Sequence, residues 1–245
     1  MPDPILITGA ARSGTSMVAG IIHACGAYGG PKPLKSPNRW NRKGMFENVG
    51  IRNSIVKPFL RSIGADPMGQ RPLPDMRVIS EFASNQQFVE EWRNRVLSAM
   101  SLPDENPVWF YKGAKMCLMW PIWANAFPDA RWLIVRRPDR DIARSCVRTS
   151  FMRKWGNFDG WLRWVAHHKL QFGAMKTCLQ DVTEVHSDAI IAGEYDALEE
   201  FVRRAGLVWR KKAVDGFVDP SLFHTGTRSV TDGKQDNRER RECDS

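Results

Sequence analysis

The feature that most constrains the fold is a glycine-rich turn at residues 9–16, close to the N-terminus. A short apolar run, Ile5 to Thr8, comes directly before the turn, and apolar residues at helical spacing follow it from Ser16 to Cys25. In a strand, glycine turn and helix of this order, the turn amides and the helix N-terminus converge on an anion. The segment therefore predicts a phosphate-binding turn at the start of an α/β fold.

Strand and helix patterns alternate along the rest of the chain. The run at 132–135 is typical of a buried strand, and a helical pattern begins after it at Asp139. Four more segments continue the alternation: strand candidates at 108–111 and 189–192, and helical patterns at 159–178 and at 80–100 behind a Ser80 cap. Strands that alternate with helices form a parallel sheet. We therefore predict a three-layer, P-loop-like α/β fold with a central parallel sheet flanked by helices.

Composition is that of a globular protein, since 42% of the 245 residues are hydrophobic and 26% are charged. We interpret residues 1–225 as one domain. Residues 226–245 have little apolar content and dense mixed charge, which is typical of a mobile tail. The region 27–79 is rich in Pro, Gly, Asn and Arg, and we expect a long loop with short helices there, without a core element.

Charge and cysteine content limit the partners and the compartment. The chain has 36 Lys and Arg against 27 Asp and Glu, and the net charge of +9 predicts affinity for anions. The five cysteines are scattered without a Cys-x-x-Cys pair, which indicates free thiols in a reducing compartment. No secretory signal is recognised, and the longest apolar run, 17–27, is shorter than the roughly 20 residues of a membrane helix. We therefore expect a cytoplasmic protein without a membrane span, and no nucleic-acid recognition motif is present.

The turn at 9–16 is close to the phosphate loop of nucleoside triphosphatases. Gly9 and Gly14 have the required spacing and Ser16 stands at the hydroxyl position, but Thr15 replaces the lysine that reaches the β- and γ-phosphates. The cation of this turn is Arg12 instead. A nucleotide kinase or triphosphatase therefore remains an alternative that explains this turn only.

A second group of cations follows the strand at 132–135. Arg136 and Arg137 stand at its carboxyl end, where ligands bind in open α/β sheets, and the following helix carries Ser145 and Arg148. Guanidinium groups with a hydroxyl suit a terminal phosphate, because arginine gives parallel charge-assisted hydrogen bonds. A triphosphatase would have a magnesium-binding acid at this strand end. The sequence therefore predicts a second anion site and no metal.

Together the two anion sites resemble those of the sulfotransferases that use 3′-phosphoadenosine 5′-phosphosulfate (PAPS), particularly the bacterial branch with a Gly-x-x-Arg-Ser-Gly-Thr-Ser turn. The resemblance covers roughly residues 4–26, 107–151 and 188–224. It implies that residues 1–225 are a sulfotransferase-like domain. It also implies in-line transfer of a sulfuryl group from PAPS to a hydroxyl or amine acceptor, leaving 3′-phosphoadenosine 5′-phosphate (PAP).

The resemblance also implies roles for individual residues. The 5′-phosphosulfate is expected on seven residues of the first turn, which are Gly9, Ala11, Arg12, Ser13, Gly14, Thr15 and Ser16. The 3′-phosphate is expected on an arginine paired with Ser145. Because Ser145 lies seven residues after Pro138, where the family usually has six, Arg136 and Arg137 both remain candidates. Further resemblance lies in the runs 111–115 and 193–198, although Gly113 stands where relatives often have an acid.

The transfer needs a cation at the leaving phosphate and a base for the acceptor proton. Arg12 suits the first role. For the base, the candidates are Glu47, His168, His23 and His167. We predict Glu47 over His168, because Glu47 lies on the long loop, in a fragment that resembles a Gly-x-x-Glu-Asn signature near the acceptor. His168 continues an apolar stripe, and His23 lies in an apolar helix, so packing roles are expected for both.

The acceptor itself cannot be read from the sequence, because a saccharide, lipid, peptide or small phenol would all fit. The ten tryptophans are mostly expected in the core, with Trp40 beside the arginine-rich loop as the exception. The sequence does not define the oligomeric state.

Overall fold

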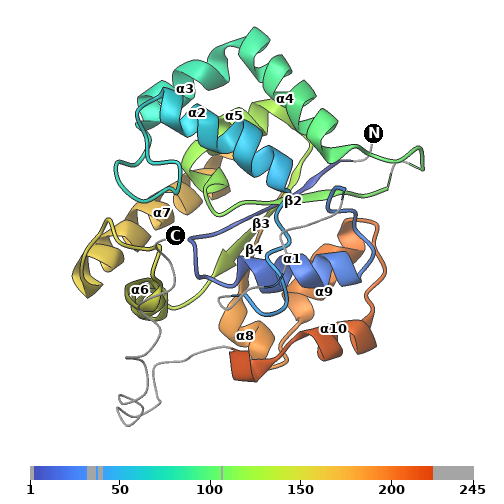
Figure 1. Ribbon diagram of the computed structural model, residues 1–245. Coiled ribbons are helices and arrows are strands. Elements are labelled where there is room, and N and C mark those ends of the chain that lie inside the picture. The colour runs from blue at the N-terminus through green and yellow to red at the C-terminus, as the bar shows by residue number, and fades with distance from the viewer. Residues whose placement is uncertain (1–2, 32–36, 38–40, 106, 223–245) are drawn as a thin grey trace, which may run out of the picture.

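A computed structural model describes residues 3–31, 37, 41–105 and 107–222 of the protein (Figure 1). Trp40 and the segment 226–245, which we interpret as a tail, lie outside these residues. No helix in the described ranges is long and apolar enough to cross a membrane. The four cysteines described are free thiols, and three of them are buried, which are Cys25, Cys117 and Cys146.

A sheet of four parallel strands forms the centre, in the order β2-β1-β3-β4. The strands are β1 (Ile5–Thr8), β2 (Phe110–Lys112), β3 (Arg131–Arg136) and β4 (Val182–His186). Ile5 of β1 pairs with Phe110 of β2 and with Arg131 of β3, so β1 lies between two strands that are more than 100 residues away in the sequence. The predicted α/β class with a central parallel sheet is confirmed.

Helices cover both faces of the sheet. Those of the first half of the chain are α1 (Thr15–Ala24), the π-helical η1 (Ile51–Val56), α2 (Lys57–Ser62), α3 (Met76–Ser84), α4 (Gln86–Met100), the 3₁₀-helical η2 (Met116–Met119) and α5 (Trp120–Ala126). Those of the second half are α6 (Asp139–Arg148), α7 (Phe158–Cys178), α8 (Ser187–Ile191), α9 (Asp196–Arg204), α10 (Lys211–Phe217) and the 3₁₀-helical η3 (Pro220–Leu222). In Figure 1, α2–α5 lie above the sheet and α1 and α8–α10 below it.

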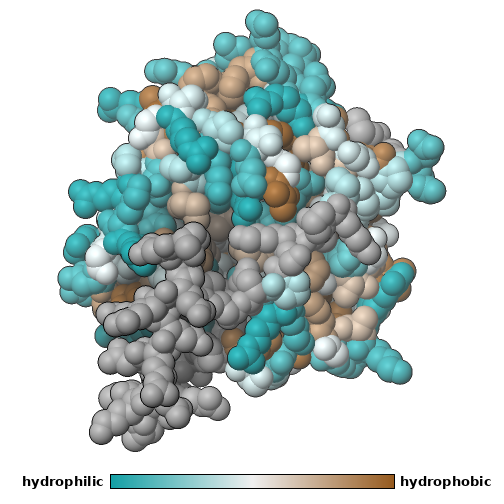
Figure 2. All heavy atoms as spheres, viewed as in Figure 1, coloured by the Kyte–Doolittle hydropathy of each residue, from teal (hydrophilic) through white to brown (hydrophobic). Residues whose placement is uncertain are grey.

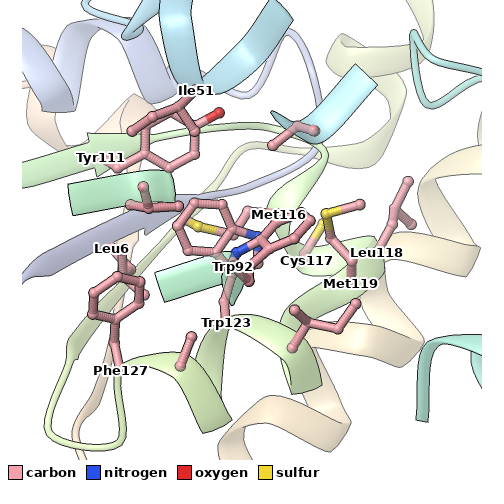
Figure 3. Close-up of a cluster of buried hydrophobic side chains, with 14 of the residues drawn as sticks. Leu6, Ile51, Trp92, Tyr111, Met116, Cys117, Leu118, Met119, Trp123 and Phe127 are labelled. Carbon is pink, nitrogen blue, oxygen red and sulfur yellow. The ribbon is translucent and has the colours of Figure 1, made fainter. Parts of the chain in front are cut away.

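Alternate strand residues pack into two separate hydrophobic cores, because successive side chains of a strand point to opposite faces of the sheet. Leu6 and Ile134 pack against helices α2–α5, and Ile5, Ile7 and Leu133 pack against α1 and α9. Figure 3 shows the first core, where the rings of Tyr111 and Trp123 stack with centroids 5.0 Å apart. Six tryptophans are buried, as expected: Trp92, Trp109, Trp123, Trp132, Trp161 and Trp164. On the face seen in Figure 2, hydrophilic side chains dominate over α2–α4.

One predicted strand is wrong. Residues 189–192 belong to helix α8 and the turn after it, while the strand of this region is β4, just before α8. β4 is an edge strand whose residues Val182, Thr183 and Glu184 are only half-buried, so it lacks the apolar run that marks β1 and β3. The strand predicted at 108–111 is present as β2, shifted toward the C-terminus.

The region 27–79 contains short helices, as expected, but the expectation that it lacks core elements is wrong. Ile51, Val56 and Leu60 are fully or almost fully buried in the first core. The predicted helix 80–100 is two helices, α3 and α4, which are interrupted at Asn85. Asn85 caps α4 by accepting a hydrogen bond from the Phe88 amide, whereas the hydroxyl of Ser80 donates within α3 and caps nothing.

Candidate anion site at the carboxyl edge of the sheet

The glycine-rich turn joins β1 to α1 at the carboxyl edge of the sheet. Arg12 has φ 74° and Gly14 has φ 97°, both in the left-handed region. A non-glycine residue in this region stores backbone strain, which is typical of functional sites. A Cβ at Gly9 would lie 2.5 Å from the carbonyl oxygen of Val135, so the close approach of the turn to β3 requires glycine.

The N-terminus of α1 is open to an anion. Its N-cap residue is Gly14, and no side chain caps the helix. In the described part of the chain, the amides of Thr15 and Ser16 donate to no backbone carbonyl. Uncapped amides at a helix N-terminus carry partial positive charge and bind phosphate-like groups. The turn therefore leaves these amides unpaired at the place where the sequence predicts a phosphate cradle.

Ser13 differs from its neighbours in the turn. Its amide donates to the carbonyl oxygen of Ala10 at 3.0 Å, which closes the turn. Its side chain is fully buried, and its hydroxyl has no hydrogen-bond partner among the residues that the structure describes. Ser13 therefore lies beneath the turn rather than on its outer surface.

Three of the predicted ligands from distant parts of the sequence meet beside the turn. Arg12 Nε donates a hydrogen bond to Ser145 Oγ at 2.9 Å. A terminal nitrogen of Arg137 donates to the carbonyl oxygen of Arg12 at 3.2 Å. The turn, the end of β3 and helix α6 thus bring two guanidinium groups and one hydroxyl together.

Both guanidinium groups of this cluster are electrostatically unfavourable where they lie. Burial lowers the pKa of Arg12, and burial also lowers the pKa of Arg137. Arg12 lowers the pKa of Arg137 further, while Asp141 and Asp188 oppose that shift. The neighbouring Cys146 supplies no counterion, because burial raises the pKa of its thiol to about 12. A bound anion would stabilise both arginines.

Arg136 points away from this cluster. Its guanidinium donates to Glu184 of β4 at 3.1 Å and lies over the ring of Phe172, with 5.3 Å between the guanidinium carbon and the ring centroid. The structure therefore separates the two alternatives of the sequence, with Arg137 beside the turn and Arg136 in an ion pair across the sheet. The alternation of side chains along a strand is the signal that distinguishes these two neighbours.

Glu47 reaches the same edge of the sheet from the long N-terminal region. It is 4% exposed, and its Oε2 lies 3.9 Å from Lys112 Nζ and 3.8 Å from a terminal nitrogen of Arg52. Lys112 ends β2, and the next residue, Gly113, donates its amide to Ile7 of β1. Sequence reasoning missed Lys112 and Arg52 as partners of this carboxylate. The place of Lys112 at the end of a predicted strand was the available signal.

The histidine candidates lie elsewhere. His168 is fully buried in α7, its Nδ1 lies 2.9 Å from the carbonyl oxygen of Trp164, and its ring packs against Trp164 at 4.1 Å. His23 is exposed, so the expected core position is wrong, although its ring contacts that of Phe46 and its Nδ1 lies 3.1 Å from the carbonyl oxygen of Ala27. His167 is exposed and contacts the ring of Trp155. No group of three or more potential metal ligands from His, Cys, Asp and Glu occurs within the described ranges.

No protein-family model matches the sequence, and a comparison with curated proteins finds no match. Among solved structures, the chain is similar to the sulfotransferase domain of the olefin synthase from Synechococcus PCC 7002. The two are 13% identical with a TM-score of 0.51, and the alignment covers 91% of this chain and 86% of that one. This likeness shows that the chain has the fold of a sulfotransferase domain, as the sequence resemblance predicted.

Two mycobacterial sulfotransferases are also similar in structure. STF1 from Mycobacterium tuberculosis is 15% identical with a TM-score of 0.47, over 89% of this chain and 71% of that one. STF9 from Mycobacterium avium is 11% identical with a TM-score of 0.47, over 88% of this chain and 67% of that one.

Proposed function

We propose that this protein is a sulfotransferase that moves a sulfuryl group from PAPS to a hydroxyl or amine acceptor by in-line transfer. The observation that carries the proposal is the contact of Arg12 with Ser145 and Arg137 beside the uncapped N-terminus of α1. The fold is that of a sulfotransferase domain. The cluster holds an excess of partly buried positive charge, which suits a nucleotide with two separate anionic groups.

The residues at this edge fit the donor. The amides of Thr15 and Ser16, with Arg12, would hold the 5′-phosphosulfate, and Arg137 with Ser145 would hold the 3′-phosphate. Bound PAPS supplies the activated sulfuryl group and a phosphate as leaving group. Arg12 would neutralise the charge that develops on this phosphate. Gly9 and Ser13 contribute by shaping the turn.

We assign the base to Glu47. Lys112 and Arg52 hold its carboxylate at the carboxyl edge of the sheet, beside the end of β1. From this place Glu47 would accept the proton of the acceptor hydroxyl as the new bond to sulfur forms. His168 is enclosed by Trp164 and Phe172 within α7, which leaves it a packing role. Free, mostly buried thiols support the proposal that the enzyme works in the cytoplasm.

The alternative, a nucleotide kinase or triphosphatase, accounts only for the position of the turn. Such an enzyme uses a lysine at the place of Thr15 and a magnesium-binding acid at the end of β3. This chain has Arg136 and Arg137 at that strand end.

Calorimetric titration with PAP, with magnesium ATP as competitor, tests the proposal. We expect PAP to bind and ATP to compete poorly. The matched pair Arg137→Gln and Arg136→Gln locates the 3′-phosphate, since loss of a charged hydrogen bond weakens binding by about 1.5–3 kcal/mol. We expect that loss for Arg137→Gln only. Preferred binding of ATP would support the kinase alternative, and a loss confined to Arg136→Gln would exchange the two arginines.

A further inference from the structure

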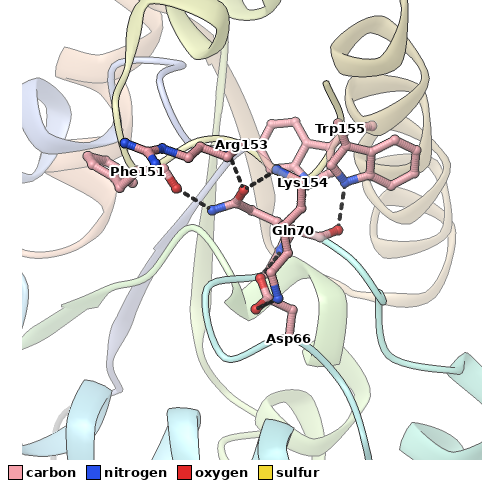
Figure 4. Close-up of polar contacts among 8 residues, drawn as sticks. Asp66, Gln70, Phe151, Arg153, Lys154 and Trp155 are labelled. Atoms are coloured by element: carbon pink, nitrogen blue, oxygen red, sulfur yellow. Dashed lines mark hydrogen bonds and ion pairs between the residues drawn. The ribbon is translucent and has the colours of Figure 1, made fainter. Parts of the chain in front are cut away.

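A buried glutamine joins two loops beside the anion site. Gln70 is 2% exposed, and its side-chain amide binds the backbone of a segment more than eighty residues later (Figure 4). Its Nε2 donates to the carbonyl oxygen of Phe151 at 2.8 Å. Its Oε1 accepts from the amides of Arg153 at 3.0 Å and Lys154 at 3.1 Å. One side chain thus satisfies three backbone groups of the segment 151–155.

Asp66 and Trp155 reinforce this contact. Asp66 is almost fully buried, and its carboxylate accepts from the backbone amide of Gln70 and from Lys154 Nζ, both at 2.8 Å. Trp155 Nε1 donates to the carbonyl oxygen of Gln70 at 2.7 Å. We call the contact between residues 66–70 and 151–155 the Gln70 clamp. Several hydrogen bonds that involve the two buried residues Gln70 and Asp66 make one relative position of the two loops strongly preferred.

The clamp lies at the end of the helix that carries Ser145. Thr149 follows α6, is buried, and donates its hydroxyl to the carbonyl oxygen of Ser145 at 2.7 Å. The amide of Met152 donates to the carbonyl oxygen of Thr149 at 2.9 Å. Met152 also packs in one apolar cluster with Ala10 of the phosphate turn. The clamped segment is therefore tied both to Ser145 and to the turn.

We infer that Gln70 is a positioning residue for the anion site, which holds the end of α6 so that Ser145 keeps its contact with Arg12. The inference rests on the proposed function, because the 3′-phosphate is the ligand that Ser145 would meet. The segment 150–157 between α6 and α7 forms no regular helix or strand. The segment therefore lacks the backbone hydrogen bonds of a helix or strand, and the side-chain hydrogen bonds of Gln70 fix its conformation instead. A binding site that is held in place before the ligand arrives has a higher affinity for that ligand.

The test compares two nucleotides that differ only in the 3′-phosphate. We expect Gln70→Met, which keeps the length of the side chain but loses its hydrogen bonds, to weaken PAP binding about tenfold, or about 1.4 kcal/mol. Binding of adenosine 5′-phosphate should weaken by a smaller factor, because that nucleotide would engage the turn amides and Arg12 but would not contact Ser145 itself. Asp66→Asn should shift the ratio of the two affinities in the same direction by a smaller factor.

Asn125→Ala is the matched control. Asn125 Nδ2 donates to the carbonyl oxygen of Ala83 at 2.8 Å and joins α5 to α3. Its loss removes a side-chain to backbone hydrogen bond that does not involve α6, so stability should fall while the ratio of PAP to adenosine 5′-phosphate affinity stays constant. Trypsin should cut after Arg153 and Lys154 faster in Gln70→Met than in Asn125→Ala, since both cations are exposed on the released segment.

The outcomes separate the two claims. If the wild-type protein binds both nucleotides equally, the proposed 3′-phosphate site fails and the inference fails with it. If the wild type prefers PAP and a folded Gln70→Met variant keeps the whole preference, the proposed function stands and the positioning role of Gln70 is overturned. An equal loss of preference in Asn125→Ala would also overturn it, because general destabilisation would then explain the effect.

Discussion

Acid should destabilise this protein in part through a single side chain, His168 of α7. The pKa of His168 is lowered from 6.5 to about 4, mainly by burial and also by the neighbouring His167, against the opposing effect of the hydrogen bond to Trp164. The folded protein therefore holds this imidazole neutral at pH values where the unfolded chain protonates it. Between the two pKa values the unfolded state binds more protons, so the free energy of unfolding rises with pH.

The magnitude follows from the two pKa values. Stability contributed by the neutral imidazole is fully present above pH 6.5 and is lost as the pH falls toward about 4. The whole difference corresponds to about 3 kcal/mol. Between pH 7 and pH 5 the expected loss is about 2 kcal/mol, a large part of the 5–15 kcal/mol that is typical of folded domains.

Urea unfolding at pH 7 and pH 5, for the wild type and for His168→Gln, measures this contribution. The variant lacks the titrating ring, so its free energy of unfolding should fall by about 2 kcal/mol less than that of the wild type over this interval. NMR titration of the His168 ring supplies an independent pKa. Equal acid sensitivity of the two proteins, or a ring that titrates near pH 6.5, would refute the reasoning and reopen His168 as the base.

Three further predictions concern the turn and its surroundings. Glu47→Gln should lower kcat by a factor of about 10²–10⁴ while PAP affinity in calorimetry stays unchanged. Glu184→Gln, which removes the carboxylate paired with Arg136, serves as the control, and equal kcat values in the two variants would show that Glu47 is not the base. Sulfuryl transfer should persist in excess EDTA, because Arg12 and the turn amides neutralise the leaving phosphate; activity that is lost and then restored by magnesium would contradict this. Gly9→Ala should destabilise the fold by about 1–3 kcal/mol in thermal unfolding, because its Cβ would meet the Val135 carbonyl, and an unchanged Tm would show that the backbone can shift.

Local signals explain which parts of the fold the sequence predicted. β1 and β3 are short apolar runs that are buried on both faces, and the glycine turn after β1 has its own spacing. β4 was not predicted, because an edge strand with half-buried residues has no such apolar run. The interruption at Asn85 was not predicted, because the apolar stripe continues past this residue. Asn is a strong N-cap residue, however, and could have indicated the start of α4.

The candidate site was predictable in residue types and not in contacts. Arg12, Arg137 and Ser145 were all named from motifs, but their meeting depends on packing between segments more than 120 residues apart. The ion pair of Arg136 with Glu184 depends on β4, which the sequence did not reveal. The role of Gln70 could not be predicted, because a glutamine in a polar region has no distinguishing pattern and its partners lie more than eighty residues later.

The order of the strands has a consequence for how the chain is made. β1 is made well before its partners, since β2 begins only at Phe110 and β3 at Arg131, and Thr8 bonds to a residue 105 positions later. At about 5–20 residues per second, a ribosome extends the chain for about 5–20 seconds before β2 exists. Throughout that interval both edges of the apolar strand β1 lack the strands that pair with them in the folded protein and can pair with other strands. The contact of Arg12 with Ser145 can therefore form only after helix α6 has been made.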